Sequence, residues 1–276
     1  NSVTYNGFTY SVTAIGEEAF YDCSSLTSMS ISEGVTRIGT RAFYGCSSLT
    51  SISIPEGMTR IGFNAFYGCS SLVSIIIPNS VTLIESAAFS GCTGLASISL
   101  PSSLTKIWSS TFSGCSNLSS ITIPNTVTEI DELAFNSCKA LSNILIPNSV
   151  KNIGQQAFQY CTNIKEIKIP ESVTKINSNV FWNCTALTNV AIPNSVTIIA
   201  SSAFEGCSKL NNVIIPSSVT KIENMVFAYC TSLTNINLSN SKVTSLSDVF
   251  RGCTNLKTIE LPQITKNKLR KNSKKK

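Results

Sequence analysis

Hydrophobic and polar positions repeat along this chain with a period of 23 residues. In the unit SSLTSISIPEGMTRIGFNAFYGC, Ile52 and Ile54 alternate with Ser51 and Ser53. Side chains along a strand point alternately to its two sides, so the isoleucines face one way and the hydroxyls the other. This alternation predicts one short strand per unit.

Two further apolar clusters complete the same unit: Met58 with Ile61, and Ala65 with Phe66 and Cys69. Three apolar clusters separated by turns predict one closed coil per unit. Equivalent strands of successive coils would then pair in parallel, about 4.8 Å apart. A unit of this size cannot bury a core alone, so we expect the coils to be stabilised by stacking on one another.

The cysteines show how far the repeat extends. All eleven are 23 residues apart, from Cys23 to Cys253, and a phenylalanine stands three residues before each of them. The chain therefore predicts a solenoid of eleven coils, roughly 50 Å long. A four-stranded propeller blade does not fit, because blades need about 40 residues or more.

The recurring motif LxxIxIPxSVTxIxxxAFxGC resembles the BspA-type leucine-rich repeat. Residues 75–82 with 88–92, and 192–197 with 203–207, carry this motif, and the resemblance covers about residues 12–262. It implies an α/β solenoid that is mostly β, a right-handed superhelix of eleven 23-residue coils with parallel strands on the concave face. It also implies a surface protein of anaerobic bacteria or parasitic protists that adheres to host matrix proteins or to other cells.

The pattern divides the chain into three parts. Residues 1–23 are expected to form a degenerate N-terminal capping repeat, because terminal repeats of solenoids are commonly atypical. Residues 24–263 are expected to form the regular leucine-rich repeat solenoid, with a local bulge in the eleventh unit. Residues 264–276 are expected to form a basic flexible tail.

The formal net charge of +6 arises in that tail. Seven of the 21 Lys and Arg residues lie there, and without them 14 basic residues face 15 acidic ones. The repeats are nearly neutral, so we expect no binding to nucleic acid. No apolar run approaches the length of a membrane span. We expect a cell-surface or secreted protein whose leader or anchor lies outside this sequence.

Composition argues against an enzyme. The chain has no histidine, which excludes Ser-His-Asp and Cys-His arrangements. Glu129, Asp131 and Glu132 form the tightest acidic cluster, which we interpret as a solvated turn. A carbohydrate-processing enzyme that uses Glu129 and Asp131 is the rival hypothesis, since glycosidases need two carboxylates facing one bond. We predict no catalytic activity and no cofactor.

Three interpretations of the cysteine column remain open. We favour buried thiols that fill space and donate weakly to loop carbonyls. Disulfides between adjacent coils are the second, because stacked Cα atoms about 4.8 Å apart lie within bonding range. A metal site is the third, although the chain has no CxxC pair and no histidine.

The outward strand positions are the leading candidate for a binding site, because strand faces of solenoids form extended binding surfaces. They carry mostly hydroxyls early in the chain and shift towards asparagine later. Few aromatic or arginine anchors are present, so keeping the sheet soluble is the alternative role. The positions are Ser28, Ser30, Ser51, Ser53, Ser74, Ile76, Ser97, Ser99, Ser120, Thr122, Asn143, Leu145, Glu166, Lys168, Asn189, Ala191, Asn212, Ile214, Asn235, Asn237, Thr258 and Glu260.

Two other surfaces are weaker candidates. A sparse basic stripe is interpreted as a solvated face, with a sulfated or sialylated glycan as the alternative partner; it comprises Arg37, Arg60, Lys106, Lys175 and Lys221. A set of aromatic residues covers the edge of the coils or anchors a partner. It comprises Tyr21, Tyr44, Tyr67, Tyr160, Trp182 and Tyr229.

Together these features predict a non-catalytic recognition or adhesion protein that binds host matrix proteins, cells or glycans through its strand face. The alternative is a structural or self-assembling scaffold. In that case the open end strand, residues 256–261, joins other subunits, because an unpaired strand edge invites pairing.

Overall fold

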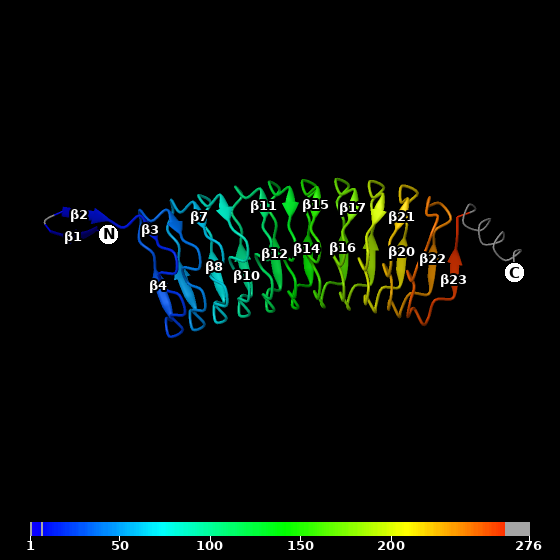
Figure 1. Cartoon of the computed structure of the whole chain (residues 1–276), viewed down its shortest axis with the longest axis horizontal. Helices are drawn as coiled ribbons and strands as arrows, with labels where there is room; N and C mark the ends of the chain where they lie inside the picture. Colours follow the sequence, from blue (N-terminus) through cyan, green and yellow to red (C-terminus); the bar gives the residue numbers. More distant parts are fainter. Residues whose placement is uncertain (1, 7, 263–276) are drawn as a thin grey trace, which may run out of the picture.

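The computed structural model describes residues 2–6 and 8–262, and it confirms the predicted solenoid. Figure 1 shows an elongated stack of coils with the first and last strands at opposite ends. The described residues contain strands and turns but no helix, so the fold is a parallel β-solenoid. The predicted basic tail, residues 264–276, lies outside the described residues.

One ladder consists of three-residue strands, and the side chains that these strands turn outward form the surface that we call the strand face. Neighbouring strands are parallel, and each residue pairs with the residue 23 positions away, as Ile98 does with Ile121. The ladder comprises β4 (Ser28–Ser30), β6 (Ser51–Ser53), β8 (Ser74–Ile76), β10 (Ser97–Ser99), β12 (Ser120–Thr122), β14 (Asn143–Leu145), β16 (Glu166–Lys168), β18 (Asn189–Ala191), β20 (Asn212–Ile214), β22 (Asn235–Asn237) and β23 (Thr258–Glu260).

A second ladder runs along another side of the coils, which the prediction of one strand per unit missed. Its strands have two residues, one exposed or half-exposed and one buried, and are too short to show an alternating pattern. Their register is again 23 residues. They are β3 (Ala14–Ile15), β5 (Arg37–Ile38), β7 (Arg60–Ile61), β9 (Leu83–Ile84), β11 (Lys106–Ile107), β13 (Glu129–Ile130), β15 (Asn152–Ile153), β17 (Lys175–Ile176), β19 (Ile198–Ile199) and β21 (Lys221–Ile222).

The chain begins with an antiparallel hairpin, β1 (Ser2–Tyr5) paired with β2 (Phe8–Ser11). The hairpin projects beyond the first coil (Figure 1). Parallel stacking begins at β3, which pairs with β5. The assignment of residues 1–23 as a capping repeat stays a prediction.

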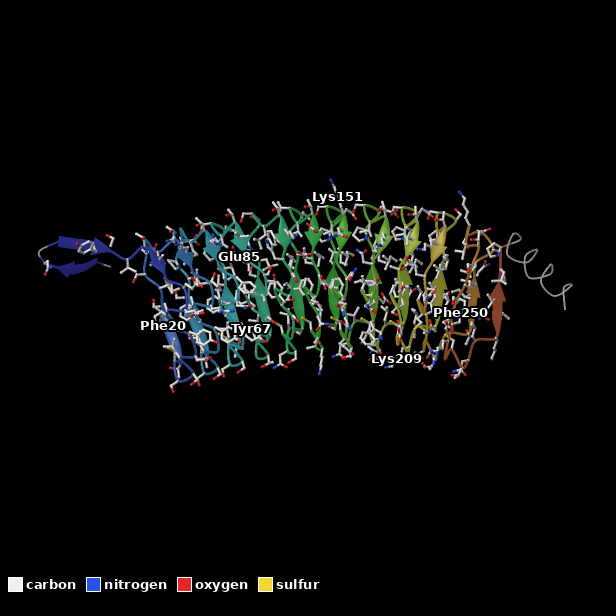
Figure 2. The ribbon with its side chains drawn as sticks, in the orientation of Figure 1. Phe20, Tyr67, Glu85, Lys151, Lys209 and Phe250 are labelled. Atoms are coloured by element: carbon white, nitrogen blue, oxygen red, sulfur yellow. The ribbon has the colours of Figure 1, made fainter. Side chains whose placement is uncertain are left out.

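A column of phenylalanine rings forms the spine of the core. Ten successive pairs, from Phe20 to Phe250, stack nearly parallel with ring centroids 5.0 to 6.0 Å apart. Phe20 and Phe250, at the two ends of this column, are labelled in Figure 2. The rings between these two ends are fully buried. Each ring fills the space above the preceding one, so the period of the sequence is also the period of the core.

The polar letters of the motif satisfy backbone groups of the neighbouring coil. The serine of SVT donates to a valine carbonyl, as Ser195 does to Val173 at 2.7 Å. The threonine donates to the carbonyl of the preceding equivalent threonine, as Thr59 does to Thr36 at 3.0 Å. Because a buried carbonyl without a partner is costly, these hydroxyls stabilise the bends where no strand pairing is available.

Each coil contains a bend residue in the left-handed backbone region. Eleven equivalent non-glycine residues have φ between 52° and 59°: Glu18, Arg41, Asn64, Ala87, Ser110, Leu133, Gln156, Asn179, Ser202, Met225 and Asp248. Side chains with a Cβ are strained there by about 1–2 kcal/mol. Amides at this bend donate to the next coil, as Arg41 N–H does to Phe63 O at 2.8 Å. Stacking therefore holds a conformation that an isolated coil would not favour.

We predict that Ala87→Gly stabilises the protein, the reverse of the usual effect of glycine. The φ of Ala87 is 54°, so glycine relieves the strain, for a net gain of about 0.5–1 kcal/mol in the free energy of unfolding. Chemical denaturation would measure it. The matched control is Ala88→Gly, at a fully buried neighbour, which we expect to destabilise by about 1 kcal/mol. Equal destabilisation by both changes would contradict strain at this bend.

Candidate binding face

All the outward strand positions that the sequence singled out are exposed on the strand face. The residue between each outward pair faces the core, as the buried Ile52 does between Ser51 and Ser53. Parallel pairing fixes the order of these side chains, since Asn189 lies beside Asn212 and Ala191 beside Ile214. The structure therefore brings residues from eleven separate repeats onto one continuous surface.

Three aliphatic side chains stand out on this face. Ile76 is 78% exposed, Leu145 75% and Ile214 73%. Each is the third residue of its strand. Soluble proteins rarely repeat large exposed aliphatic residues at one structural position without a use for them. Sequence analysis identified Leu145 and Ile214 as exposed apolar positions, and the structure adds Ile76.

The strand face carries two shallow depressions. One, of about 450 Å³, lies where the ladder is interrupted between β14 and β16; its outward lining residues are Asn143, Leu145, Glu166, Lys168, Asn189 and Ala191. The other, of about 350 Å³, lies beside Ile214 and is lined also by Asn235, Asn237 and Glu260. Both depressions combine an aliphatic side chain with amides and carboxylates.

A third depression, of about 430 Å³, went unnoticed at the sequence level. It lies at β21, the last strand of the second ladder, next to Thr244 and Ser245. The eleventh repeat is one residue short at that point, and this was the available signal. Inside it, the Lys221 ammonium donates to Glu223 at 2.6 Å and holds the pKa of that carboxyl below its usual value.

Acidic partners largely neutralise the basic stripe on the second ladder. Arg60 pairs with Glu85, and Lys221 with Glu223. Lys106 lies 3.1 Å from both Glu129 and Asp131. Three of the five cations thus spend their charge within the protein, which weakens the case for an acidic glycan at this stripe.

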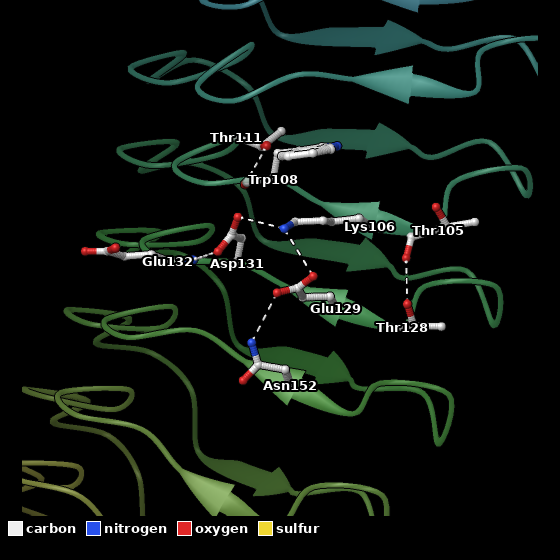
Figure 3. Close-up of polar contacts among 9 residues, drawn as sticks. All are labelled: Thr105, Lys106, Trp108, Thr111, Thr128, Glu129, Asp131, Glu132 and Asn152. Atoms are coloured by element: carbon white, nitrogen blue, oxygen red, sulfur yellow. Dashed lines mark hydrogen bonds and ion pairs between the residues drawn. The ribbon is translucent and has the colours of Figure 1, made fainter.

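The acidic cluster is an ion-pair network rather than a pair of free carboxylates. Figure 3 shows Lys106 between Glu129 and Asp131. Glu129 also accepts from the Asn152 amide at 3.2 Å, and Asp131 accepts from the Glu132 N–H at 2.9 Å. Partial burial lowers the pKa of Lys106, but the two carboxylates outweigh it and raise that pKa above its usual value. The arrangement leaves neither carboxylate poised as an acid or a nucleophile.

The surface aromatics occur in two groups. Tyr21, Tyr44 and Tyr67 stack with ring centroids 4.8 and 4.7 Å apart. Tyr160 and Trp182 make a tilted contact at 5.2 Å. The column ends after Tyr67, where the next repeat has Ser90. Both proposed roles, covering the edge and anchoring a partner, are compatible with these contacts.

The cysteine column confirms the favoured interpretation. Cys69 donates its S–H to Phe43 O at 3.2 Å, and Cys138 donates to Phe112 O at 3.1 Å. The same bond recurs along the column from Cys46 to Cys253. The thiols are free, and nine are buried. Each joins its own coil to a bend of the preceding one.

Neither a metal cluster nor a membrane-spanning helix occurs in the described part of the chain. No group of three or more Cys, Asp or Glu side chains is placed to hold a metal ion within residues 2–6 and 8–262. The same residues include no helix long and apolar enough to cross a bilayer.

Comparison with known proteins decides the family. The BspA type leucine-rich repeat region matches residues 2–107, 59–188 and 174–273, with six copies. The chain belongs to the BspA-type leucine-rich repeat family. This repeat supplies both the 23-residue coil and the recurring Phe and Cys positions on which the strand face is built.

Solved structures of other BspA-type or leucine-rich repeat proteins resemble this one. A leucine-rich repeat protein from Bacteroides ovatus is 33% identical, with a TM-score of 0.71, over 95% of this chain and 80% of that one. A leucine-rich cell surface protein from Faecalibacterium prausnitzii is 30% identical, with a TM-score of 0.59, over 96% and 88% of the two chains. A comparison with curated proteins returned no match.

We predict that thiol reagents distinguish the end of this BspA-type column from its interior. Cys23 is exposed, whereas burial raises the pKa of Cys46 to about 11 and that of Cys69 and Cys115 to about 12. Only thiolates react, so at pH 8 we expect one fast thiol, a slower one at the half-buried Cys253, and nine that react only on unfolding.

The measurement is a timed titration with an aromatic disulfide reagent, with and without denaturant. Cys23→Ser is the control and should remove the fast phase alone. Rapid reaction of the interior thiols in the folded protein would contradict the buried column.

Proposed function

We propose that this protein is a non-catalytic recognition module that binds host matrix proteins, cells or glycans through its strand face. The observation that carries this proposal is the continuous exposed surface on which eleven repeats place their outward side chains. A surface of this kind offers many weak polar contacts rather than one deep pocket.

The chemistry of the face supports recognition over catalysis. Its hydroxyls and amides donate and accept hydrogen bonds, and Ile76, Leu145 and Ile214 supply apolar contacts among them. The carboxylates of the one acidic cluster are tied up by Lys106. Binding through many such groups gains from multivalency when the protein is displayed at high density.

We infer a cell-surface or secreted location. The similar protein from Faecalibacterium prausnitzii is described as a leucine-rich cell surface protein, and its sequence is 30% identical to this one over 96% of this chain. A surface rich in Ser, Thr and Asn with few charges suits contact with extracellular polymers.

A structural scaffold is the second candidate, and β23 favours it. This strand pairs with β22 on one side, and Ile259 at its centre is 42% exposed. An open strand edge with an exposed aliphatic residue is a template for pairing with another chain. Ile259→Lys would abolish assembly through this edge while leaving ligand binding to the strand face intact.

We predict that the double change Asn189→Arg with Asn212→Arg weakens ligand binding at least tenfold. These residues pair side by side at the centre of the face, so two arginines add bulk and like charge there. An array of matrix proteins and glycans identifies the ligand, and surface plasmon resonance measures the dissociation constants of both proteins.

A charge-matched control places two arginines on the other ladder. Asn152→Arg with Ile198→Arg fills positions equivalent to Arg37 and Arg60 and should leave binding unchanged. Undiminished binding by the first double variant would place the ligand away from the strand face.

A further inference from the structure

The three exposed aliphatic residues of the strand face are evenly spaced. Ile76, Leu145 and Ile214 are separated by 69 residues each, which is three coils, or roughly 14 Å along the solenoid. Leu145 lies on β14, the sixth of the eleven three-residue strands that the structure describes. The apolar positions are therefore arranged symmetrically about the middle of the face.

This symmetry is that of a self-complementary surface. A two-fold axis parallel to the strands and passing beside β14 turns the coil order of a second copy around while keeping its strand direction. Ile76 then faces Ile214 of the second copy, and Leu145 faces its own equivalent. Such an isologous contact is the commonest form of protein dimer.

We propose that the strand face pairs with that of a second copy of this chain, antiparallel, with Leu145 on the two-fold axis. The proposal rests on the proposed function, because it names a second copy as one partner of the same face. All eleven strands of one copy lie against all eleven of the other, so this register also gives the greatest overlap.

The charges of the face fit the same register. Three charged residues occupy the outward strand positions: Glu166, Lys168 and Glu260. The axis places them opposite Ser120, Thr122 and Ser30 of the second copy. No two like charges meet, and each charged group faces a hydroxyl that can hydrogen-bond to it.

The depressions provide room for the apolar contacts. The depression of about 350 Å³ beside Ile214 lies where Ile76 of the second copy arrives. The depression of about 450 Å³ beside Leu145 adjoins the axis. By contrast, an arrangement with the two copies parallel would place the third strand positions against the first, so that Ile76 would meet Ser74.

The size of the face sets the expected affinity. A strip of about 50 Å by about 10 Å buries on the order of 500 Å² per copy. This is below the roughly 800 Å² per partner of stable complexes, so the pairing is weak in solution. On crowded surfaces many such contacts act together, and the same pairing then joins surfaces that display this protein.

Sedimentation equilibrium of the full chain, at concentrations up to about 1 mM, tests the proposal. We expect a reversible monomer–dimer equilibrium, and at least a tenfold higher dissociation constant for Leu145→Lys or Ile76→Lys. Lysine is tolerated in this column, where Lys168 already stands. Leu83→Lys is the matched control, because its equivalents on the second ladder include Arg60 and Lys106, and it should dimerise as the unaltered chain does.

Two charge-pair experiments test the register. In the double variant Ile76→Lys with Ile214→Glu, each lysine faces a glutamate, so dimerisation should recover from the loss seen in Ile76→Lys. A mixture of Leu145→Lys and Leu145→Glu chains should form a heterodimer, whereas Leu145→Lys alone should not dimerise. Failure of both rescues would overturn the antiparallel register.

Two other results would overturn the proposal as a whole: a chain that stays monomeric at the highest concentration, and assembly that persists in Leu145→Lys but disappears in Ile259→Lys. The latter would assign self-association to the end strand. The measurement needs no other ligand, so an array without binding partners would count against the proposed function alone.

Discussion

The fold depends on one constraint: every residue is stacked on the residue 23 positions before it. Phenylalanine rings lie on phenylalanine rings at 5.0 to 6.0 Å, and thiols, hydroxyls and amides bond to the backbone of the adjoining coil. A single coil buries too little surface to hold its own bends, several of which adopt strained backbone conformations. Stability is therefore shared between coils, and a change at one position acts on the two coils that touch it.

The same constraint explains the composition. Because like residues stack about 4.8 Å apart, a charge repeated in every unit would repel itself along the whole column. Only 13% of residues are charged, and several charges face an opposite one across a coil boundary, as Lys106 does with Glu129 and Arg41 with Glu18. Serine, threonine and asparagine avoid the conflict, since each both donates and accepts hydrogen bonds. The polar strand face is thus partly a consequence of stacking itself, which is why its aliphatic exceptions are informative.

Periodicity predicted what depends on one repeat at a time. The alternation of Ile52 with Ser51 and Ser53 was sufficient to assign the outward positions, and the spacing of Cys and Phe was sufficient to assign the core columns. The second ladder was missed because two residues, such as Arg60 and Ile61, show no alternation. The interruption beside Leu145 and the neutralisation of Lys106 depend on neighbouring coils and on side-chain reach, which a consensus motif does not describe.

The regularity of the strand face also limits what can bind it well. Aromatic and arginine anchors are few, so no single contact is strong, and affinity depends on how many contacts form together. A compact protein with an irregular surface would meet only a few of these groups in favourable geometry. A partner with its own repeat, such as a matrix polymer, a glycan chain or a second solenoid, keeps its contacts aligned over many coils. The exposed aliphatic residue in every third coil narrows this further, to partners whose apolar groups recur at intervals of roughly 14 Å.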